Sequence, residues 1–164
     1  MFPLLHPCLN SFYTKISGKD NPNANIWVNN LVRNDLTWAV NHIKSSSGIY
    51  MLCTLDWGVD NSDLTIYCDA CLEGMGFWYP DHSLAYYSPV PKNIPTDFIF
   101  YYEALCVLSA LLHASQTSST PLCIIIFTVN TNTVNMFNSM RDLPAYNYIL
   151  HSSVDVRLQT QHQL

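Results

Sequence analysis

The chain has 164 residues, of which 49% are hydrophobic and 12% are charged, and its formal net charge is -5. This length and hydrophobic content are enough for one globular domain with a complete core and a short additional segment. The acidic balance argues against a free-standing nucleic-acid-binding protein, because phosphate contacts require clustered Lys and Arg. The low share of charged residues, about half the usual one, indicates either a surface covered by a partner or a piece of a longer protein.

Residues 1–58 differ from the rest of the chain and form a lead-in segment. They begin with a proline-containing stretch and a polar loop, GKDNPNAN. Apolar residues then recur every three or four positions between Asn29 and Ser45, which predicts an amphipathic helix whose main part is capped by Asn34 or Asp35. The short apolar run IYMLCTL follows, and we expect it to pair as a strand or to pack under the domain.

A strand, a turn and a second strand are predicted over Asp63–Pro80. Apolar and polar residues alternate from Leu64 to Asp69, and GMGFWYP follows after a turn relaxed by glycine, which indicates an antiparallel hairpin. Asp69 is unusual because Asp is depleted in strands and is costly to desolvate unless it is paired or bound to a cation. We therefore expect this strand to deliver Asp69 into a buried setting.

A third strand, SLAYYS over residues 83–88, and a proline-rich loop come next. Thr96 or Asp97 then caps a predicted helix, DFIFYYEALCVLSALLHAS, with Glu103 in its middle. An acid on an apolar helix face is a second anomaly, although for a single Glu considered alone a solvated or hydrogen-bonded boundary residue is the favoured explanation. The expected neighbours of Glu103 on the helix surface are Ile99, Phe100, Cys106 and Val107.

The last part of the chain predicts one strand, two helices and a final strand. PLCIIIFTV, residues 121–129, is typical of a central strand covered on both sides. The turn NTNT supplies a candidate cap for a short helix, and AYNYILHSS predicts a second helix. Alternating residues after that helix predict the final strand, so the expected fold class is α/β with a mixed sheet. The apolar residues expected to line these elements are Val134, Phe137, Met140, Tyr146, Ile149 and Leu150 in the helices and Val154, Val156 and Leu158 in the final strand.

Four motifs together resemble a known family. YCDAC, GMGFWYP, FYYEALCVLSALLHA and IIIFTVNTNTVNMFNSM are similar, in order and spacing, to the ribonuclease H region of retrotransposon polyproteins, especially fungal ones. Residues 1–58, with LNSFYTKISGK and VRNDLTWAVNHI, resemble the end of the reverse transcriptase that precedes this region. The resemblance implies a ribonuclease H-like domain over residues 59–164, with three antiparallel strands, a helix, a strand, two helices and a last strand.

The resemblance also implies a metal site. In the family, four carboxylates hold two magnesium ions at the scissile phosphate of the RNA strand in an RNA·DNA hybrid, and two such cations about 3.5 to 4 Å apart need bridging oxygen ligands. Asp69 and Glu103 match two of these positions as catalytic residues and metal ligands. The third position, an Asp in a T-D-N context, is Val129 here, and the last acid would follow the point where this chain ends. We therefore expect at most weak magnesium binding and a severely impaired, C-terminally truncated domain.

Three functions stay open from the sequence. The favoured one is a retroelement-derived ribonuclease H-like fragment without efficient activity. The second is an active magnesium-dependent ribonuclease H, in which a neighbouring carboxylate replaces Val129 or another chain supplies the missing end. The third is a non-enzymatic module that binds a protein partner through an uncovered sheet edge or apolar surface.

Charge, cysteine usage and hydropathy limit which partners and which cellular location we expect. Residues 59–164 contain three Lys or Arg against nine Asp or Glu, so binding to an RNA·DNA hybrid is expected to be weak. The six cysteines are expected to behave as small reduced hydrophobes, although Cys68 and Cys71 form a C-x-x-C. We expect a soluble intracellular chain without a membrane helix or targeting signal, marginal folding, and self-association through uncovered apolar surface.

Overall fold

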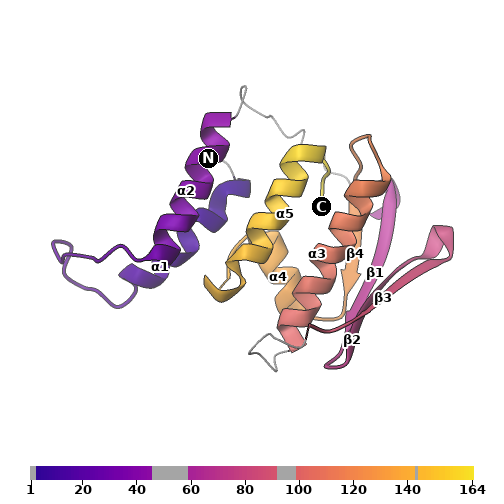
Figure 1. The fold of residues 1–164 in the computed structure, drawn as a ribbon, viewed down its shortest axis with the longest axis horizontal. Helices are drawn as coiled ribbons and strands as arrows, with labels where there is room; N and C mark the ends of the chain where they lie inside the picture. Colours follow the sequence, from indigo (N-terminus) through magenta and orange to yellow (C-terminus); the bar gives the residue numbers. More distant parts are fainter. Residues whose placement is uncertain (1–2, 46–58, 92–98, 143) are drawn as a thin grey trace.

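The computed structural model describes residues 3–45, 59–91, 99–142 and 144–164. These residues form an α/β fold with one mixed four-stranded sheet and five α-helices (Figure 1). The predicted hairpin, the third strand and the helix that carries Glu103 are all present. The elements in chain order are η1 (Pro3–Leu9), α1 (Asn10–Ile16), α2 (Asn30–Ser45), η2 (Val59–Asn61), β1 (Leu64–Ala70), β2 (Gly74–Tyr79), η3 (Pro80–His82), β3 (Leu84–Pro89), α3 (Ile99–Thr117), β4 (Ile124–Thr128), α4 (Thr131–Ser139), η4 (Pro144–Tyr146) and α5 (Asn147–Thr160).

The sheet has the strand order β3-β2-β1-β4. β2 runs antiparallel to both β1 and β3, whereas β4 runs parallel to β1. Figure 1 shows the helices to one side of this sheet, with α3 nearest to it, and α3 contacts β1, β2 and β4. The parallel pairing of β1 and β4 brings the ends of both strands to the same edge, where Cys68 lies opposite Thr128.

The core lies between α3 and the sheet. Alternate residues of β1 from Leu64 to Ala70 are buried against α3, as the period of two predicted. Small side chains on α3, among them Ala104 and Ala110, are fully buried, which lets this helix approach the strands closely. α3 is long and apolar, but no helix among the described residues has the length and hydropathy that crossing a bilayer requires.

The two glycines of β2 lie close to β3, Gly74 against an aromatic ring and Gly76 against the backbone. A Cβ atom added to Gly74 would lie 2.4 Å from Cε2 of Tyr87, and one added to Gly76 would lie 3.0 Å from the carbonyl oxygen of Tyr86. The prediction that glycine serves the turn is wrong, because neither glycine has the positive φ that only glycine adopts easily. The hairpin closes through the Cys71 amide, which donates to the Gly74 carbonyl at 2.8 Å.

α2 confirms the helix predicted between Asn29 and Ser45, but its cap differs from the prediction. Asn29 accepts a hydrogen bond from the Val32 amide at 3.0 Å, so the helix is capped one turn earlier than Asn34 or Asp35 would allow. Asp35 instead lies within α2, and its side chain is buried. The run IYMLCTL and the predicted cap of α3 lie outside the described residues.

A polar network joins the N-terminal helices to α5. The Asp155 carboxylate accepts a hydrogen bond from the Trp38 indole at 2.8 Å and contacts Nε2 of His42 at 2.7 Å. The Trp38 ring also stacks on His151, with 4.1 Å between the ring centroids. These contacts hold α2 against α5. The domain boundary predicted at residue 58 lies outside the described residues and stays a prediction.

The predicted final strand is wrong. Val154, Val156 and Leu158 belong to α5, which runs without interruption to Thr160. Val154 follows Leu150 by four residues and Val156 follows Ile149 by seven, so the same apolar side chains form one buried helical stripe. Helical periodicity over the longer segment outweighs the short alternation.

β4 is consequently an edge strand of the described sheet and not the central strand that the sequence predicted. Its outer side meets a single parallel bridge between Cys123 and Gln163. In this bridge the Ile124 amide donates to the Gln163 carbonyl at 2.8 Å, and the Gln163 amide donates to the Leu122 carbonyl at 2.8 Å. Beyond Ile124 the described part of the chain places no strand against this edge.

Candidate functional site

Asp69 is the second-last residue of β1, as predicted, but its side chain is exposed. The prediction of a buried setting is wrong because Cys68 and Ala70, its neighbours along the strand, both face α3. Alternation therefore turns Asp69 toward the other face of the sheet. There it lies opposite Gly76 in the register of the hairpin.

Glu103 is buried on α3, with 2% of its surface exposed. The Thr128 hydroxyl at the end of β4 donates a hydrogen bond of 3.0 Å to Oε2 of Glu103. The backbone amide of Ala70 at the end of β1 also interacts with this carboxylate. Glu103 is therefore the hydrogen-bonded acid that links α3 to the ends of both parallel strands.

Burial raises the pKa of the Glu103 carboxyl above its ordinary value. The hydrogen bond from Thr128 lowers this pKa, the negative charge of Asp69 raises it, and the Ala70 amide lowers it, with a net increase. Asp69 is thus near enough to influence Glu103 electrostatically. A metal site shared by the two acids stays a prediction. The raised pKa means that the surroundings of Glu103 disfavour the negative charge that a metal ligand carries.

The segment after β4 contains no acid at the position where the family resemblance places one. Val129 is 81% exposed and follows directly after the strand. Asn130, the first residue of the predicted capping turn NTNT, caps α4 because its side-chain oxygen accepts from the Thr133 amide at 3.1 Å. Sequence reasoning missed Thr128, although its even spacing from Ile124 along β4 assigns it to the buried face that meets Glu103.

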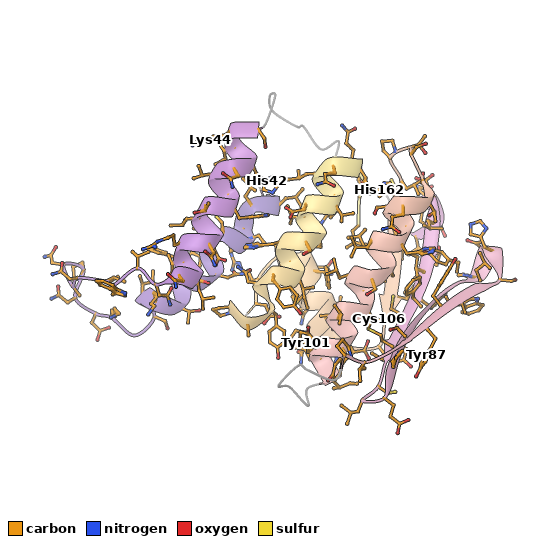
Figure 2. All side chains as sticks on the ribbon, in the orientation of Figure 1. His42, Lys44, Tyr87, Tyr101, Cys106 and His162 are labelled. Carbon is orange, nitrogen blue, oxygen red and sulfur yellow. The ribbon has the colours of Figure 1, made fainter. Side chains whose placement is uncertain are left out.

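Two buried thiols lie beneath the end of β1. Cys106 points from α3 to the sheet (Figure 2), and its Sγ donates to the Gly76 carbonyl at 3.1 Å. The hydrogen bond with Cys106, together with burial, raises the pKa of the Cys68 thiol. Cys71 is exposed, so the C-x-x-C pair does not form a joint site. Cys68 and Cys106 therefore behave as small buried hydrophobes, as predicted.

Other polar residues near the C-terminus are engaged elsewhere. Asp155 contacts Trp38 and His42 on the far side of the helical layer. His162 is buried, burial lowers its pKa, and its Nδ1 accepts a hydrogen bond from the Leu122 amide at 3.0 Å. Neither side chain supplements the pair formed by Asp69 and Glu103.

The donor set does not fit two magnesium ions. The described residues contain no group of three or more His, Cys, Asp or Glu side chains arranged to hold a metal. Of the two available carboxylates, Glu103 is buried and already bound by a hydroxyl, while Asp69 is exposed. Magnesium requires a near-octahedral set of oxygen ligands, and hard-cation affinity follows ligand charge and number.

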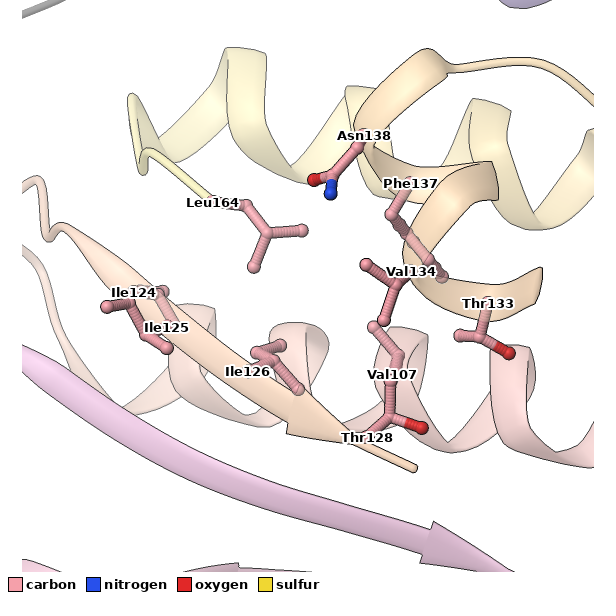
Figure 3. A pocket seen from close by; sticks show the side chains of 10 residues that line it. All are labelled: Val107, Ile124, Ile125, Ile126, Thr128, Thr133, Val134, Phe137, Asn138 and Leu164. Atoms are coloured by element: carbon pink, nitrogen blue, oxygen red, sulfur yellow. The ribbon is translucent and has the colours of Figure 1, made fainter. Parts of the chain in front are cut away.

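A separate pocket of about 190 Å³ lies between β4, α3 and α4 (Figure 3). Its walls are mostly aliphatic, and Thr128 lies at one end while Leu164 lies near the other. Neither Asp69 nor Glu103 lines it. The pocket is therefore an apolar gap beside the edge strand, distinct from the carboxylate pair.

In comparisons with known proteins, no family model, curated protein or solved structure matches the chain. The fold class therefore rests on the structure alone. The fold is α/β, with a mixed sheet in the order β3-β2-β1-β4 and a parallel β1–β4 pair.

Proposed function

We propose that this chain is a retroelement-derived ribonuclease H-like domain that no longer cleaves RNA efficiently. The placement of two acids supports the ancestry: Asp69 lies at the end of β1, and Glu103 lies on the first helix after the three antiparallel strands. Both acids therefore lie on the elements that carry two of the metal-binding acids in the ribonuclease H family pattern. The motifs that suggested the resemblance lie on β1, β2, α3, β4 and α4, so they belong to one mixed sheet and the helices beside it.

One observation supports the loss of activity more than any other. The hydrogen bond from Thr128 to Glu103 uses a carboxylate oxygen that a two-metal site would need, and the next residue is the hydrocarbon Val129. A buried carboxylate that is hydrogen-bonded to the end of β4 joins α3 to the sheet, whereas two-metal hydrolysis requires several ionised oxygen ligands.

Electrostatics also disfavours a hybrid substrate. The two arginines among the described residues of 59–164 lie away from the carboxylate pair. Arg141 donates to Nε2 of His6 at 3.0 Å, and Arg157 is half-buried on α5, where burial lowers its pKa to about 10. Nucleic-acid binding needs exposed cations that follow the phosphate backbone.

Cleavage of a labelled RNA·DNA hybrid in the presence of magnesium or manganese tests this proposal. We expect no cleavage above that of the Asp69→Asn variant, which removes the exposed acid of the pair. Robust cleavage that Asp69→Asn abolishes would instead establish the active enzyme. A control hybrid incubated with the metal alone measures the background.

A further inference from the structure

The face of the sheet opposite the helices carries a row of three aromatic side chains, Trp78, Tyr67 and Phe127. Tyr67 on β1 pairs in register with Trp78 on β2 and with Phe127 on β4. The ring centroid of Tyr67 is 5.8 Å from that of Trp78 and 5.0 Å from that of Phe127, so the three rings form a continuous aromatic row. Their exposed fractions lie between 37% and 48%.

Tyr87 enlarges this aromatic face at the next register position. Tyr87 is 75% exposed, and its ring occupies the space that a side chain at position 74 would fill. Figure 2 shows Tyr87 on the sheet, and Figure 1 shows no described helix over this face. Aromatic side chains left half exposed in one contiguous patch are typical of interaction surfaces, where Trp and Tyr contribute much of the binding energy.

The charged Asp, Glu, Lys and Arg residues on the described strands and loops of the sheet are all acidic. Residues 59–91, which include β1, β2 and β3, contain five Asp or Glu and no Lys or Arg. Asp69 lies on the same face as the row, in line with Gly76 and Tyr87 across the strands. β4 adds no charged residue. A partner that covers this face therefore meets aromatic rings bordered by a carboxylate.

We propose that this face binds a protein segment that combines Arg or Lys with aliphatic side chains. Cationic side chains gain from the faces of Trp and Tyr rings and from nearby Asp69, while aliphatic side chains cover the remaining ring area. Single-stranded nucleic acid also stacks on exposed aromatic rings, but its phosphates require cations, and the described residues 59–91 and β4 contain no Lys or Arg. The proposal goes beyond the proposed function and does not depend on it, because it uses the rings and not the metal-ligand pattern.

The test measures the binding of a short labelled peptide of alternating Arg and Leu to the full chain by fluorescence anisotropy. The matched probes are the same peptide with Glu in place of Arg and a labelled single-stranded oligothymidine. Of these three probes, we expect only the Arg–Leu peptide to bind. Replacing two rings of the row, in Tyr67→Thr/Trp78→Thr, should weaken this binding at least about tenfold.

Two single variants define the surface further. Asp69→Asn should weaken binding of the Arg–Leu peptide about threefold, because an exposed charge contributes modestly. Trp27→Thr removes an exposed aromatic residue that lies before α2, away from the sheet, and should leave the affinity within about twofold. If the double variant does not fold, Phe127→Thr on the edge strand provides the same comparison, with an expected loss of about threefold.

Several results would overturn the proposal. They are absence of binding by the Arg–Leu peptide, equal binding of the Glu–Leu peptide, and an affinity that the ring variants do not change. Oligothymidine binding that the ring variants abolish would assign the face to nucleic acid. Dimerisation in sedimentation that the same variants abolish would assign it to a second copy of the chain.

Discussion

The two faces of the four-stranded sheet are built from different side chains. Residues such as Ile66 and Ile124 on the covered face are fully buried against helices, whereas Tyr67 and Trp78 on the other face are about half exposed. Burial of apolar surface is the main source of folding free energy, so the covered face determines stability. Large aromatic side chains on the uncovered face contribute less to folding and are available to a partner.

The two candidate acids follow this division. Glu103 is buried on the helix side and hydrogen-bonded, while Asp69 is exposed on a strand whose neighbouring residues face inward. Two acids that look equivalent in the sequence therefore have different environments. The comparison teaches that Glu103 is constrained by the fold, whereas Asp69 can change with little effect on folding.

The largest expected effect comes from a cavity in the covered layer. Leu111→Ala removes a fully buried side chain of α3 and should lower the free energy of unfolding by about 3 kcal/mol. Leu112→Ala, at the adjacent exposed position, is the matched control and should cost less than ~1 kcal/mol. Urea unfolding measures both, and equal losses would contradict the burial pattern of α3.

The hydrogen bond that holds Glu103 gives the next effect. Thr128→Val keeps the shape of the side chain but removes the donor, and should lower the free energy of unfolding by about 1.5 kcal/mol near neutral pH. Thr65→Val, on the uncovered side of β1, should change it by less than ~0.5 kcal/mol. The loss should disappear when Thr128→Val is combined with Glu103→Met, which leaves no hydrogen-bonding group at position 103, and a loss that persists there would separate Thr128 from the carboxylate.

Removing the charge of Glu103 should stabilise the protein near neutral pH. The pKa of this carboxyl is raised in the folded state, so its contribution to stability is fully present below its ordinary pKa and is lost as the pH rises through the folded pKa. Glu103→Gln avoids burying a charge, and the Thr128 hydroxyl can rotate to accept from the new amide. We expect a gain of about 1 kcal/mol near pH 7 and a smaller one near pH 4.

Urea unfolding over the same pH range should show a flatter pH dependence for Glu103→Gln than for the wild type. A Glu103→Gln variant that keeps the wild-type pH dependence would show that Glu103 does not titrate with a raised pKa.

The smallest effect is expected on the uncovered face. Tyr67→Thr retains a residue suited to strands and should lower the free energy of unfolding by less than ~1 kcal/mol. Ile66→Thr, one position away on the covered face, should lower it by more than ~2 kcal/mol because it buries a hydroxyl and leaves a cavity. If the two substitutions had equal effects, the two faces of β1 would not differ as the structure indicates.

Much of the fold follows from periodicity in the sequence. The period of two identified β1, and the mostly apolar stretch after the proline-rich loop identified α3. The Asn130 cap of α4 was also predictable because a side-chain oxygen three residues before a free amide is a local feature. Local signals were sufficient wherever one spacing fitted the whole element.

The errors arose where two periodicities or distant partners competed. Val154 and Val156 fit both an alternating strand and a helical stripe, and packing of α5 against α3 favours the helix. The hydrogen bond from Trp38 to Asp155 joins residues 117 positions apart, so no local pattern announces it. For the site, the positions of Asp69 on a strand and of Glu103 on a helix were predicted correctly, but the exposure of Asp69 was not.

Gly74 illustrates how one position becomes tied to another. Its backbone conformation does not demand glycine, and the ring of Tyr87 alone excludes a side chain there. In related chains the two positions should therefore co-vary, with glycine kept only while an aromatic ring lies opposite. An alignment would then show, from the residue at position 74, in which related chains the aromatic surface is retained.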